Sequence, residues 1–315
     1  MSEDTVEFGV MLSATSNSYG LTDEESPGVF RELATTAENS GFDVVLAGDH
    51  IAYPSEIPTE YGYSSSGEPP FDTTTSVYDV FQVFAHLAAV TDDIRFGTNV
   101  VAVPYRHPIV LAKNALTLDS LSGGRFDFGL APGWLKTEFD ALDVPFDERG
   151  SRTDEFLELF TRACEEGELS FEGEHHSFGE MGFHPSPSSE IPLWIGGRSG
   201  ATFRRIAQFG HGWSTLWEKP DEVGSARDRI MNAWADFERE GEPEIGLLRP
   251  MHVAEDGSGP SGKILTGTPE SVVEDVQSYV DAGATRIIVD FFSTDIDDQV
   301  EQLERIGEHV IPAFR

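Results

Sequence analysis

The sequence predicts an α/β fold in which parallel strands alternate with helices, and three observations lead to it. Segments rich in β-branched residues alternate with segments of helical apolar periodicity, giving eight strand–helix units. The loops after predicted strands are rich in Gly, Pro, Asn and Trp, as in α/β folds that bind ligands at the carboxyl ends of their strands. A length of 315 residues suits one large domain, 1–315, without an internal linker.

The expected elements follow from this alternation. The predicted strands are 6–12, 42–47, 94–103, 125–130, 193–195, 212–216, 245–253 and 285–291. The predicted helices are 29–40, 76–90, 109–121, 153–164, 201–209, 220–240, 269–282 and 296–310. Three longer segments interrupt the pattern: a polar loop at 51–75, a hairpin-like insertion at 169–187 and an insertion at 254–265.

The unit at 93–134 has the clearest signals for where its elements begin and end. Pro108 suits the first helical turn, where its missing N–H costs no hydrogen bond. The glycine pair Gly123-Gly124 follows the apolar stripe of the helix, and glycine is free to adopt the left-handed conformation of a C-cap. The sequence therefore predicts a strand, a helix and a second strand with sharp boundaries.

The charge of the chain excludes several kinds of partner. Lys plus Arg number 21 against 56 Asp plus Glu, so the net charge is -35. A surface this acidic repels nucleic acid and anionic membranes. The acidic residues are spread over every predicted helix, and few of the basic residues are lysines. This composition is typical of a halophilic protein from a salt-accumulating cytoplasm, where dense salt screens the self-repulsion.

Other classes are excluded by what the sequence lacks. No apolar run is long enough to cross a bilayer, and the start MSEDTVEF lacks the features of a signal peptide, so we expect a cytoplasmic protein. The single cysteine, Cys164, excludes an internal disulfide. The adjacent pair His175-His176 cannot face one way on a strand, so we expect no metal site and an exposed position for both.

Two short motifs at predicted strand ends are candidates for chemistry. The Asp49 carboxylate can accept hydrogen bonds from a ligand, and the His50 imidazole can exchange a proton near neutral pH; the alternative is a salt-bridged surface pair. Backbone N–H groups of Gly196, Gly197, Arg198 and Ser199, before a predicted helix, can bind phosphate; the alternative is a plain turn.

A third candidate follows the fourth strand. Trp134, after Pro132 and Gly133, can stack on a ligand or wall a substrate pocket, or it can be an ordinary core aromatic residue.

The wording of several segments resembles one family. The segment 97–134 reads GTNVVAVPYRHPIVLAKNALTLDSLSGGRFDFGLAPGW. The segment GFDVVLAGDH (41–50) precedes it. The segments IPLWIGG (191–197), FGHGW (209–213) and GTPESVVEDVQSYVDAGATRIIV (267–289) follow it, and all of them stand in the order found in one family. Together these segments resemble the luciferase-like monooxygenase family, whose members use flavin or deazaflavin coenzymes. The resemblance implies a (β/α)8 TIM barrel with insertions in its strand-end loops.

The resemblance also implies roles for individual residues. Asp49 would hold the coenzyme ring, and His50 would handle the substrate proton. The coenzyme would further contact the residues Asn99, Val100, Val101, Pro132, Gly133, Trp134, Gly196, Gly197, Arg198, Ser199 and, less directly, Thr202. Deazaflavin-binding members often carry a non-proline cis peptide after the third strand, which here is the Asn99–Val100 bond. Trp134 stands where deazaflavin-dependent sugar-phosphate dehydrogenases carry a catalytic glutamate, so sugar-phosphate oxidation is not implied.

The function expected from these features is that of an oxidoreductase that transfers hydride between coenzyme F420 and a small organic substrate. Two features favour F420. The segment Gly48-Asp49-His50 resembles the deazaflavin subgroup, and the acidic composition favours a haloarchaeal source, since archaea of that kind make coenzyme F420. The alternatives are an FMN-dependent monooxygenase, a flavin-binding protein without catalysis and a barrel hydrolase, although carboxylate and metal constellations for hydrolysis are lacking. The helix 76–90 is apolar on nearly all sides, which together with the family habit predicts a homodimer through 29–40, 76–90 and 109–121.

Overall fold

The computed structural model describes residues 5–12, 21–55, 71–260 and 265–315. Parallel strands form a closed ring in the order β3-β2-β1-β13-β10-β9-β8-β5-β4, and an additional β3–β5 pairing closes it. The strands are β1 (Glu7–Met11), β2 (Val44–Ala47), β3 (Arg95–Thr98), β4 (Val101–Ala102), β5 (Phe126–Ala131), β8 (Leu193–Gly196), β9 (Gly212–Leu216), β10 (Glu244–Pro250) and β13 (Arg286–Asp290). Because β3 and β4 share one position in the ring, the barrel has eight positions, which confirms the predicted (β/α)8 architecture.

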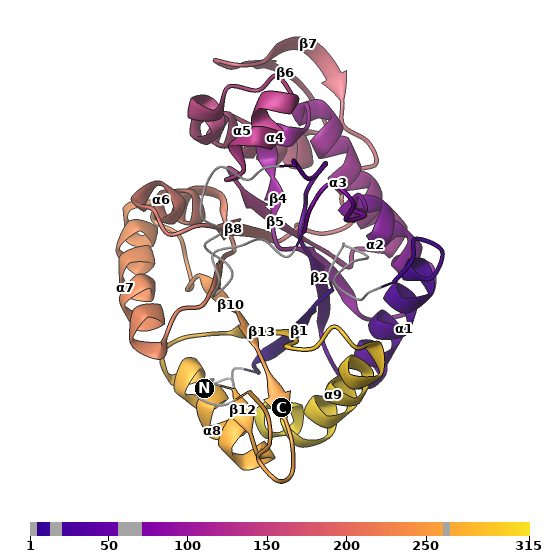
Figure 1. Ribbon diagram of the computed structural model, residues 1–315. Helices are drawn as coiled ribbons and strands as arrows, with labels where there is room; N and C mark the ends of the chain where they lie inside the picture. The colour runs from indigo at the N-terminus through magenta and orange to yellow at the C-terminus, as the bar shows by residue number, and fades with distance from the viewer. Residues whose placement is uncertain (1–4, 13–20, 56–70, 261–264) are drawn as a thin grey trace.

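Helices surround the ring of strands, as the view down the barrel shows (Figure 1). They are α1 (Ser26–Asn39), α2 (Val80–Ala88), α3 (Pro108–Ser122), α4 (Lys136–Ala141), α5 (Arg149–Glu166), α6 (Gly200–Phe209), α7 (Pro220–Asp236), α8 (Pro269–Asp281) and α9 (Ile296–His309). Of these, α4 lies in a segment that the sequence analysis leaves without structure. In the described part of the chain, no helix combines the length and the apolar character needed to span a bilayer.

The helix of the unit at 93–134 begins and ends as predicted. Pro108 is the first residue of α3, and the His107 side chain accepts a hydrogen bond from Ile109 N at 3.3 Å. Gly123 takes the left-handed conformation at the end of the helix, with φ 73°. The expected continuous strand 94–103 was wrong: the chain forms β3, then the Asn99–Val100 bond, then β4. That bond is cis, which confirms the prediction made from the resemblance.

The third and fifth strands meet unusually closely beside this interruption. A Cβ atom on Gly129 would lie 1.8 Å from the carbonyl oxygen of Thr98, so only glycine fits there. The Thr98 hydroxyl donates to Gly129 O at 2.7 Å and accepts from Gly129 N at 2.8 Å. A side chain thus takes over the pairing between β3 and β5 where the main-chain ladder stops.

The amino ends of the strands close the barrel interior with a charged floor, made of Glu7, Arg95, Asp127 and Arg286. Arg286 is 2% exposed; its guanidinium donates to Glu7 Oε2 at 2.7 Å and lies 2.8 Å from Asp127 Oδ2. The ring of Trp194 covers the same guanidinium, 3.9 Å from Cζ. Each buried charge has a partner, as buried charges in proteins require. The floor therefore serves stability and leaves the opposite end of the barrel for ligands.

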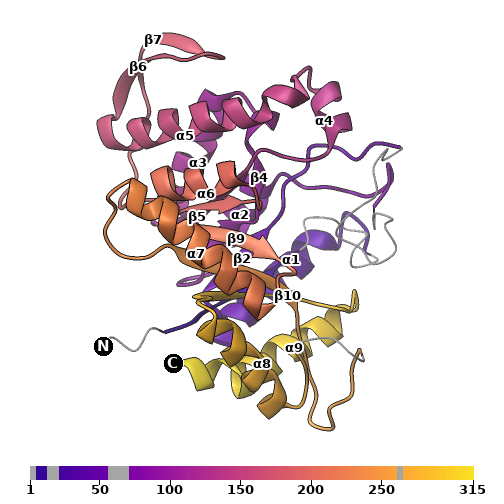
Figure 2. The ribbon, with the colours of Figure 1, turned by 90° about the vertical axis from the view of Figure 1, so that its left-hand side faces the viewer.

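The insertion after α5 is a hairpin on the outside of the barrel, as expected. Strands β6 (Glu168–Glu172) and β7 (Ser177–Gly182) pair antiparallel and extend beyond α5 (Figure 2). The two histidines at its turn are not exposed as expected: the side chains of His175 and His176 are 7% and 21% exposed. Both bind Glu155 of α5, through His175 N at 2.8 Å and His176 Nδ1 at 2.8 Å. They attach the hairpin to the barrel.

Candidate active site

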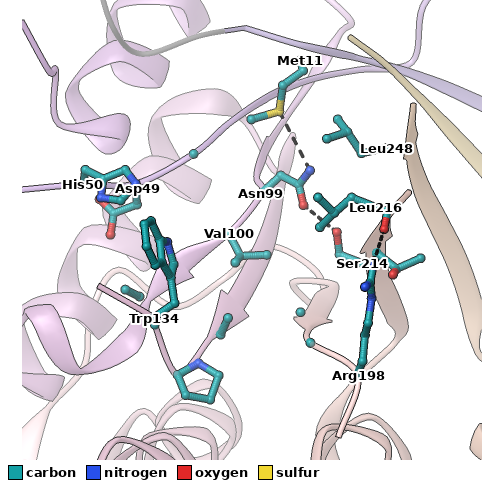
Figure 3. Close-up of a pocket in the computed structure, with 18 of the residues that line it drawn as sticks. Met11, Asp49, His50, Asn99, Val100, Trp134, Arg198, Ser214, Leu216 and Leu248 are labelled. Carbon is teal, nitrogen blue, oxygen red and sulfur yellow. Dashed lines mark hydrogen bonds between the residues drawn. The ribbon is translucent and has the colours of Figure 1, made fainter. Parts of the chain in front are cut away.

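A cavity of about 690 Å³ opens at the carboxyl ends of the strands (Figure 3). Its size is in the range of small-molecule and cofactor sites. Ten of the thirteen residues that the sequence analysis selects for chemistry line it: Asp49, His50, Asn99, Val100, Pro132, Gly133, Trp134, Gly196, Gly197 and Arg198. The remaining three, Val101, Ser199 and Thr202, lie outside the lining.

His50 follows β2 and is held by a residue from a distant part of the chain. Its Nδ1 lies 2.7 Å from Glu138 Oε2, although the two residues are 88 positions apart. Glu138 lies in the first turn of α4 and is 3% exposed. Its other oxygen, Oε1, accepts hydrogen bonds from Ile51 N at 2.8 Å and Ala52 N at 3.3 Å. One buried carboxylate thus positions both the imidazole and the chain after it.

The protonation of Glu138 determines the tautomer of His50. Burial alone would raise the pKa of Glu138, but hydrogen bonds from His50, Ile51 and Tyr105 outweigh burial and hold the pKa below its ordinary value. Burial and the nearby Glu138 charge raise the pKa of Tyr105, so its hydroxyl stays protonated and donates to Glu138 Oε2 at 2.9 Å. An ionised Glu138 accepts the Nδ1–H of His50. The other imidazole nitrogen, Nε2, is then the proton acceptor of the neutral ring.

Asp49 points into a different network. Its two carboxylate oxygens accept hydrogen bonds from the Arg106 guanidinium at 2.7 and 2.8 Å. Arg106 also donates to Asp79 at 2.8 Å, and Asp79 caps α2 by accepting from Phe81 N. Burial disfavours the charge on Arg106, but Asp49 and Asp79 outweigh this and raise its pKa. Arg106 therefore fixes Asp49 at the edge of the cavity.

Asn99 and Val100 form the inner wall. The Ser214 hydroxyl of β9 donates to Asn99 Oδ1 at 2.5 Å across the cavity lining (Figure 3). Val100 lines the cavity, whereas Val101 is fully buried in the hydrophobic core. The Val101 side chain, expected to contact the coenzyme, therefore points away from the cavity, because neighbouring residues of an extended chain face opposite sides.

The glycine pair after β8 reaches the cavity, but the residues after it turn to other partners. Gly197 has φ 117°, and its carbonyl accepts from Trp213 Nε1 at 2.7 Å. Ser199 caps α6, accepting from Thr202 N at 3.1 Å. Thr202 is 3% exposed, and its hydroxyl lies 3.0 Å from Ser199 Oγ. The Thr202 side chain thus supports the turn from behind.

Arg198 lines the cavity with its guanidinium engaged elsewhere. It pairs with Glu218 and donates to the carbonyl of Leu216 (Figure 3). Glu218 is 6% exposed and also accepts from Thr215 Oγ1 at 2.6 Å. A phosphate bound at this turn would therefore meet backbone N–H groups first, and Arg198 only if it changes rotamer.

Trp134 walls the cavity, and the alternative of an ordinary core aromatic residue is excluded. Its indole lies edge-on to the His50 imidazole, with ring centroids 6.3 Å apart (Figure 3). The indole offers a flat apolar surface directly beside the candidate proton acceptor.

The cavity fits a flavin-type coenzyme. Val100, Ala131 and Trp134 give an apolar wall, and Asn99 and Ser214 add polar groups beside it, the combination that holds a flat heterocycle. A Cβ on Gly196 would lie 3.2 Å from Val100 Cγ1, so glycine keeps this side of the cavity open. The adjoining start of α6 suits a phosphate.

Several residues of the site are not among those predicted from the sequence. Glu138 could have been suspected, because it stands beside Phe139 in an otherwise polar stretch, but its partner is far away in the sequence. Asp290 was hidden inside a predicted strand that extended to residue 291; it is the last residue of β13 and lines the cavity. Ser214 and Leu248, on β9 and β10, carried no motif that could have identified them.

Comparisons with known proteins give a consistent picture. Residues 6–259 match the profile of the family described as luciferase-like monooxygenase. An uncharacterised protein of Mycobacterium tuberculosis is 29% identical over 287 residues, covering 89% of this chain and 93% of its own. A 5,10-methylenetetrahydromethanopterin reductase of Methanopyrus kandleri is 23% identical over 366 residues, covering 94% of this chain and 97% of its own.

Solved structures share the fold. The monooxygenase RslO1 from Streptomyces bottropensis superposes with a TM-score of 0.81 at 22% identity, covering 98% of this chain and 100% of its own. A coenzyme F420 dependent tetrahydromethanopterin reductase from Methanopyrus kandleri gives a TM-score of 0.76 at 20% identity, covering 99% of this chain and 100% of its own.

Proposed function

Because the chain belongs to the luciferase-like monooxygenase family, we propose that it is an oxidoreductase that transfers hydride between coenzyme F420 and a small organic substrate. The observation that carries this proposal is the His50–Glu138 pair at the edge of the cavity. Glu138 accepts the Nδ1–H of His50 and leaves Nε2 as a base, and within the described residues no hydrogen bond engages Nε2. A base so placed accepts the proton of a substrate hydroxyl or amine and returns it in the reverse reaction.

The remaining residues have supporting roles. Val100 and Trp134 would pack against the coenzyme ring, Asn99 and Ser214 would offer it polar groups, and the turn at Gly196-Gly197 would hold its phosphate. A deazaflavin supplies two electrons as hydride and activates oxygen poorly. The resemblance of the segment Gly48-Asp49-His50 to the deazaflavin subgroup and the similarity to the coenzyme F420 dependent reductase from Methanopyrus kandleri support F420.

A second candidate is an FMN-dependent monooxygenase, which the similarity to the Streptomyces monooxygenase favours. Both candidates are tested by titrating the purified protein with F420 and with FMN, followed by absorbance. We expect F420 to bind and its visible band to bleach or recover with a reducing or oxidising substrate. Binding of FMN alone, with oxygen consumption on reduction, would favour the monooxygenase, and binding without turnover would favour a non-catalytic protein.

The variant His50→Ala separates binding from chemistry. We expect coenzyme affinity to stay within a few-fold, while turnover falls by roughly 10²-fold or more, the usual contribution of a general acid or base. Equal turnover in His50→Ala and the wild type would remove His50 from the mechanism.

We also propose that the protein forms a homodimer. The apolar residues of α2 that motivated this expectation are covered within the chain: Val80, Phe81, Val83, Phe84 and Leu87 are buried. The neighbouring helix α3 instead exposes Val110 (51%) and Leu121 (65%). These two apolar side chains support an interface on α3.

A further inference from the structure

We propose that Asp290 is the substrate-recognition carboxylate of this site and that it binds a protonated nitrogen of the organic substrate. The inference rests on the proposed function, which leaves the substrate class open. It follows from where β13 places Asp290, from the partners of the other charged groups around the cavity, and from the apolar surroundings of its carboxylate.

The alternation of β13 brings Asp290 into the cavity. Arg286 belongs to the charged floor, Ile288 packs inside the barrel with Val44 and Leu46, and Asp290 is the next residue on the same face. Because β13 ends there, the carboxylate lies at the carboxyl end of the barrel, where it lines the cavity.

Asp290 differs from the other charged residues of the lining. Asp49 is paired with Arg106, His50 with Glu138 and Arg198 with Glu218. In residues 5–12, 21–55, 71–260 and 265–315, the one hydrogen bond to the Asp290 carboxylate comes from Phe291 N to Oδ1 at 2.9 Å. Oδ2 is left for a ligand, and no described cation offsets the charge.

The apolar surroundings of Asp290 disfavour its negative charge when no cation is bound. Register pairs Pro250 of β10 with Asp290, and Met11 of β1 and Leu248 of β10 line the same part of the barrel interior. None of these three side chains carries a charge. Burial raises the pKa of Asp290 to about 6, so near neutral pH it is ionised against a desolvation penalty. A bound cation offsets this penalty, whereas a second anion would increase it.

The position of β13 in the ring separates Asp290 from Trp134 and from the phosphate-binding turn at Gly196-Gly197. In the closed order of strands, β13 lies opposite β5, whose end carries Ala131 and is followed by Trp134. It lies three positions from β8, where the phosphate-binding turn begins. An anionic phosphate would be repelled by Asp290. A carboxylate at this place therefore suits the substrate and not the coenzyme tail.

The test compares two probes of the same shape, benzylammonium and benzyl alcohol, binding to the whole protein in molar KCl. Affinities are measured by ligand-observed NMR for the wild type, Asp290→Asn and the control Asp297→Asn, an exposed carboxylate early in α9. We expect the wild type and the control to prefer the ammonium probe by roughly tenfold, the size of a charge-assisted hydrogen bond, and Asp290→Asn to lose the preference.

Asp290→Leu provides a second variant, because leucine removes the carboxylate without placing an amide group among the apolar neighbours. We expect it to lose the preference as Asp290→Asn does. Equal binding of the two probes by the wild type, or an unchanged preference in both variants, would overturn the proposal. Titration of the same variants with F420 and FMN keeps the two proposals apart. Loss of the probe preference with unchanged coenzyme affinity assigns Asp290 to the substrate, while absence of coenzyme binding in the wild type contradicts the proposed function alone.

Discussion

The Nδ1 atom of His50 lies 2.7 Å from the buried carboxylate of Glu138, which also binds the main chain of Ile51 and the hydroxyl of Tyr105. This pair joins the end of β2 to the start of α4 and sets the orientation of the imidazole. A carboxylate behind a histidine fixes its ring and its tautomer. The proposed base thus depends on two residues: His50 would contact the substrate, and Glu138 positions His50.

Glu138→Gln keeps the shape of this side chain and removes its charge. We expect turnover to fall by roughly 10- to 100-fold, as when the hydrogen-bonded partner of a functional histidine is removed. Coenzyme affinity should stay within a few-fold, since Glu138 is not part of the cavity lining. Steady-state kinetics and coenzyme titration measure the two effects. Asp140→Asn, an exposed change on the same helix, serves as the control, and a matching loss there would contradict the role of Glu138.

Asp49→Asn should act mainly on folding. The side chains of Asp49 and Arg106 are 0% and 8% exposed, so the variant leaves a buried guanidinium with Asp79 as its remaining partner. Breaking a buried pair costs roughly 3 kcal/mol or more of unfolding free energy. Denaturant titration measures this loss. Wild-type stability combined with weakened coenzyme binding would instead indicate that the Asp49 carboxylate serves the ligand.

Asp290 should make stability depend on pH in an unusual direction. Its pKa rises from 3.8 to about 6 on folding, so the folded state holds the proton more tightly than the unfolded state. The protonated carboxyl is tolerated below pH 4, and stability falls as pH rises through 6. Relative to Asp290→Asn, the wild type should lose up to about 3 kcal/mol between pH 4 and pH 7, at 1.36 kcal/mol per pKa unit. Thermal unfolding at a series of pH values measures this loss. The same pH dependence of stability in the wild type and in Asp290→Asn would contradict the prediction.

Salt should stabilise the protein strongly. With a net charge of -35, the folded chain repels itself, and the Debye length falls from about 10 Å at 0.1 M salt to about 3 Å at 1 M. We expect the unfolding midpoint to rise steeply with KCl. Full cooperative stability in dilute buffer would contradict the halophilic interpretation of the composition.

The proposed dimer can be tested on α3. Leu121→Glu places a charge on the exposed apolar face of this helix and should convert the dimer into a monomer in light scattering at high salt. Met181→Glu, at an exposed apolar position of the hairpin, should leave the mass unchanged. A monomeric wild type would remove the proposal.

Local patterns in the sequence determined much of this fold. Pro108 and Gly123 marked the ends of α3 correctly because their backbone preferences act within a few residues. The six-residue α4 escaped notice because so short and polar a helix has no periodicity to detect. Its Glu138 is buried against His50, Ile51 and Tyr105, which lie far away in the sequence, so the pairing itself could not be predicted from the local pattern.

The interruption of the third strand is a second feature that local patterns did not predict. A β-branched run predicted one strand, and the similarity of Gly97-Thr98-Asn99-Val100 to known sequences was needed to place the cis bond within it. Asp290 was overlooked because the apolar residues around it made the strand seem to continue. Sequence periodicity thus located the helices and strands. Which polar groups at their ends meet in the cavity is determined by the closure of the barrel.

The charged floor has a consequence for the order in which ligands bind and leave. Arg286, Glu7, Asp127 and the ring of Trp194 close the amino end of the barrel among the described residues. The coenzyme and the substrate of the proposed reaction would then share the entrance at the carboxyl ends, and the one that binds first would lie in the path of the other. A substrate in excess is therefore expected to obstruct the exchange of the coenzyme, so the order of arrival becomes part of the kinetics of this protein.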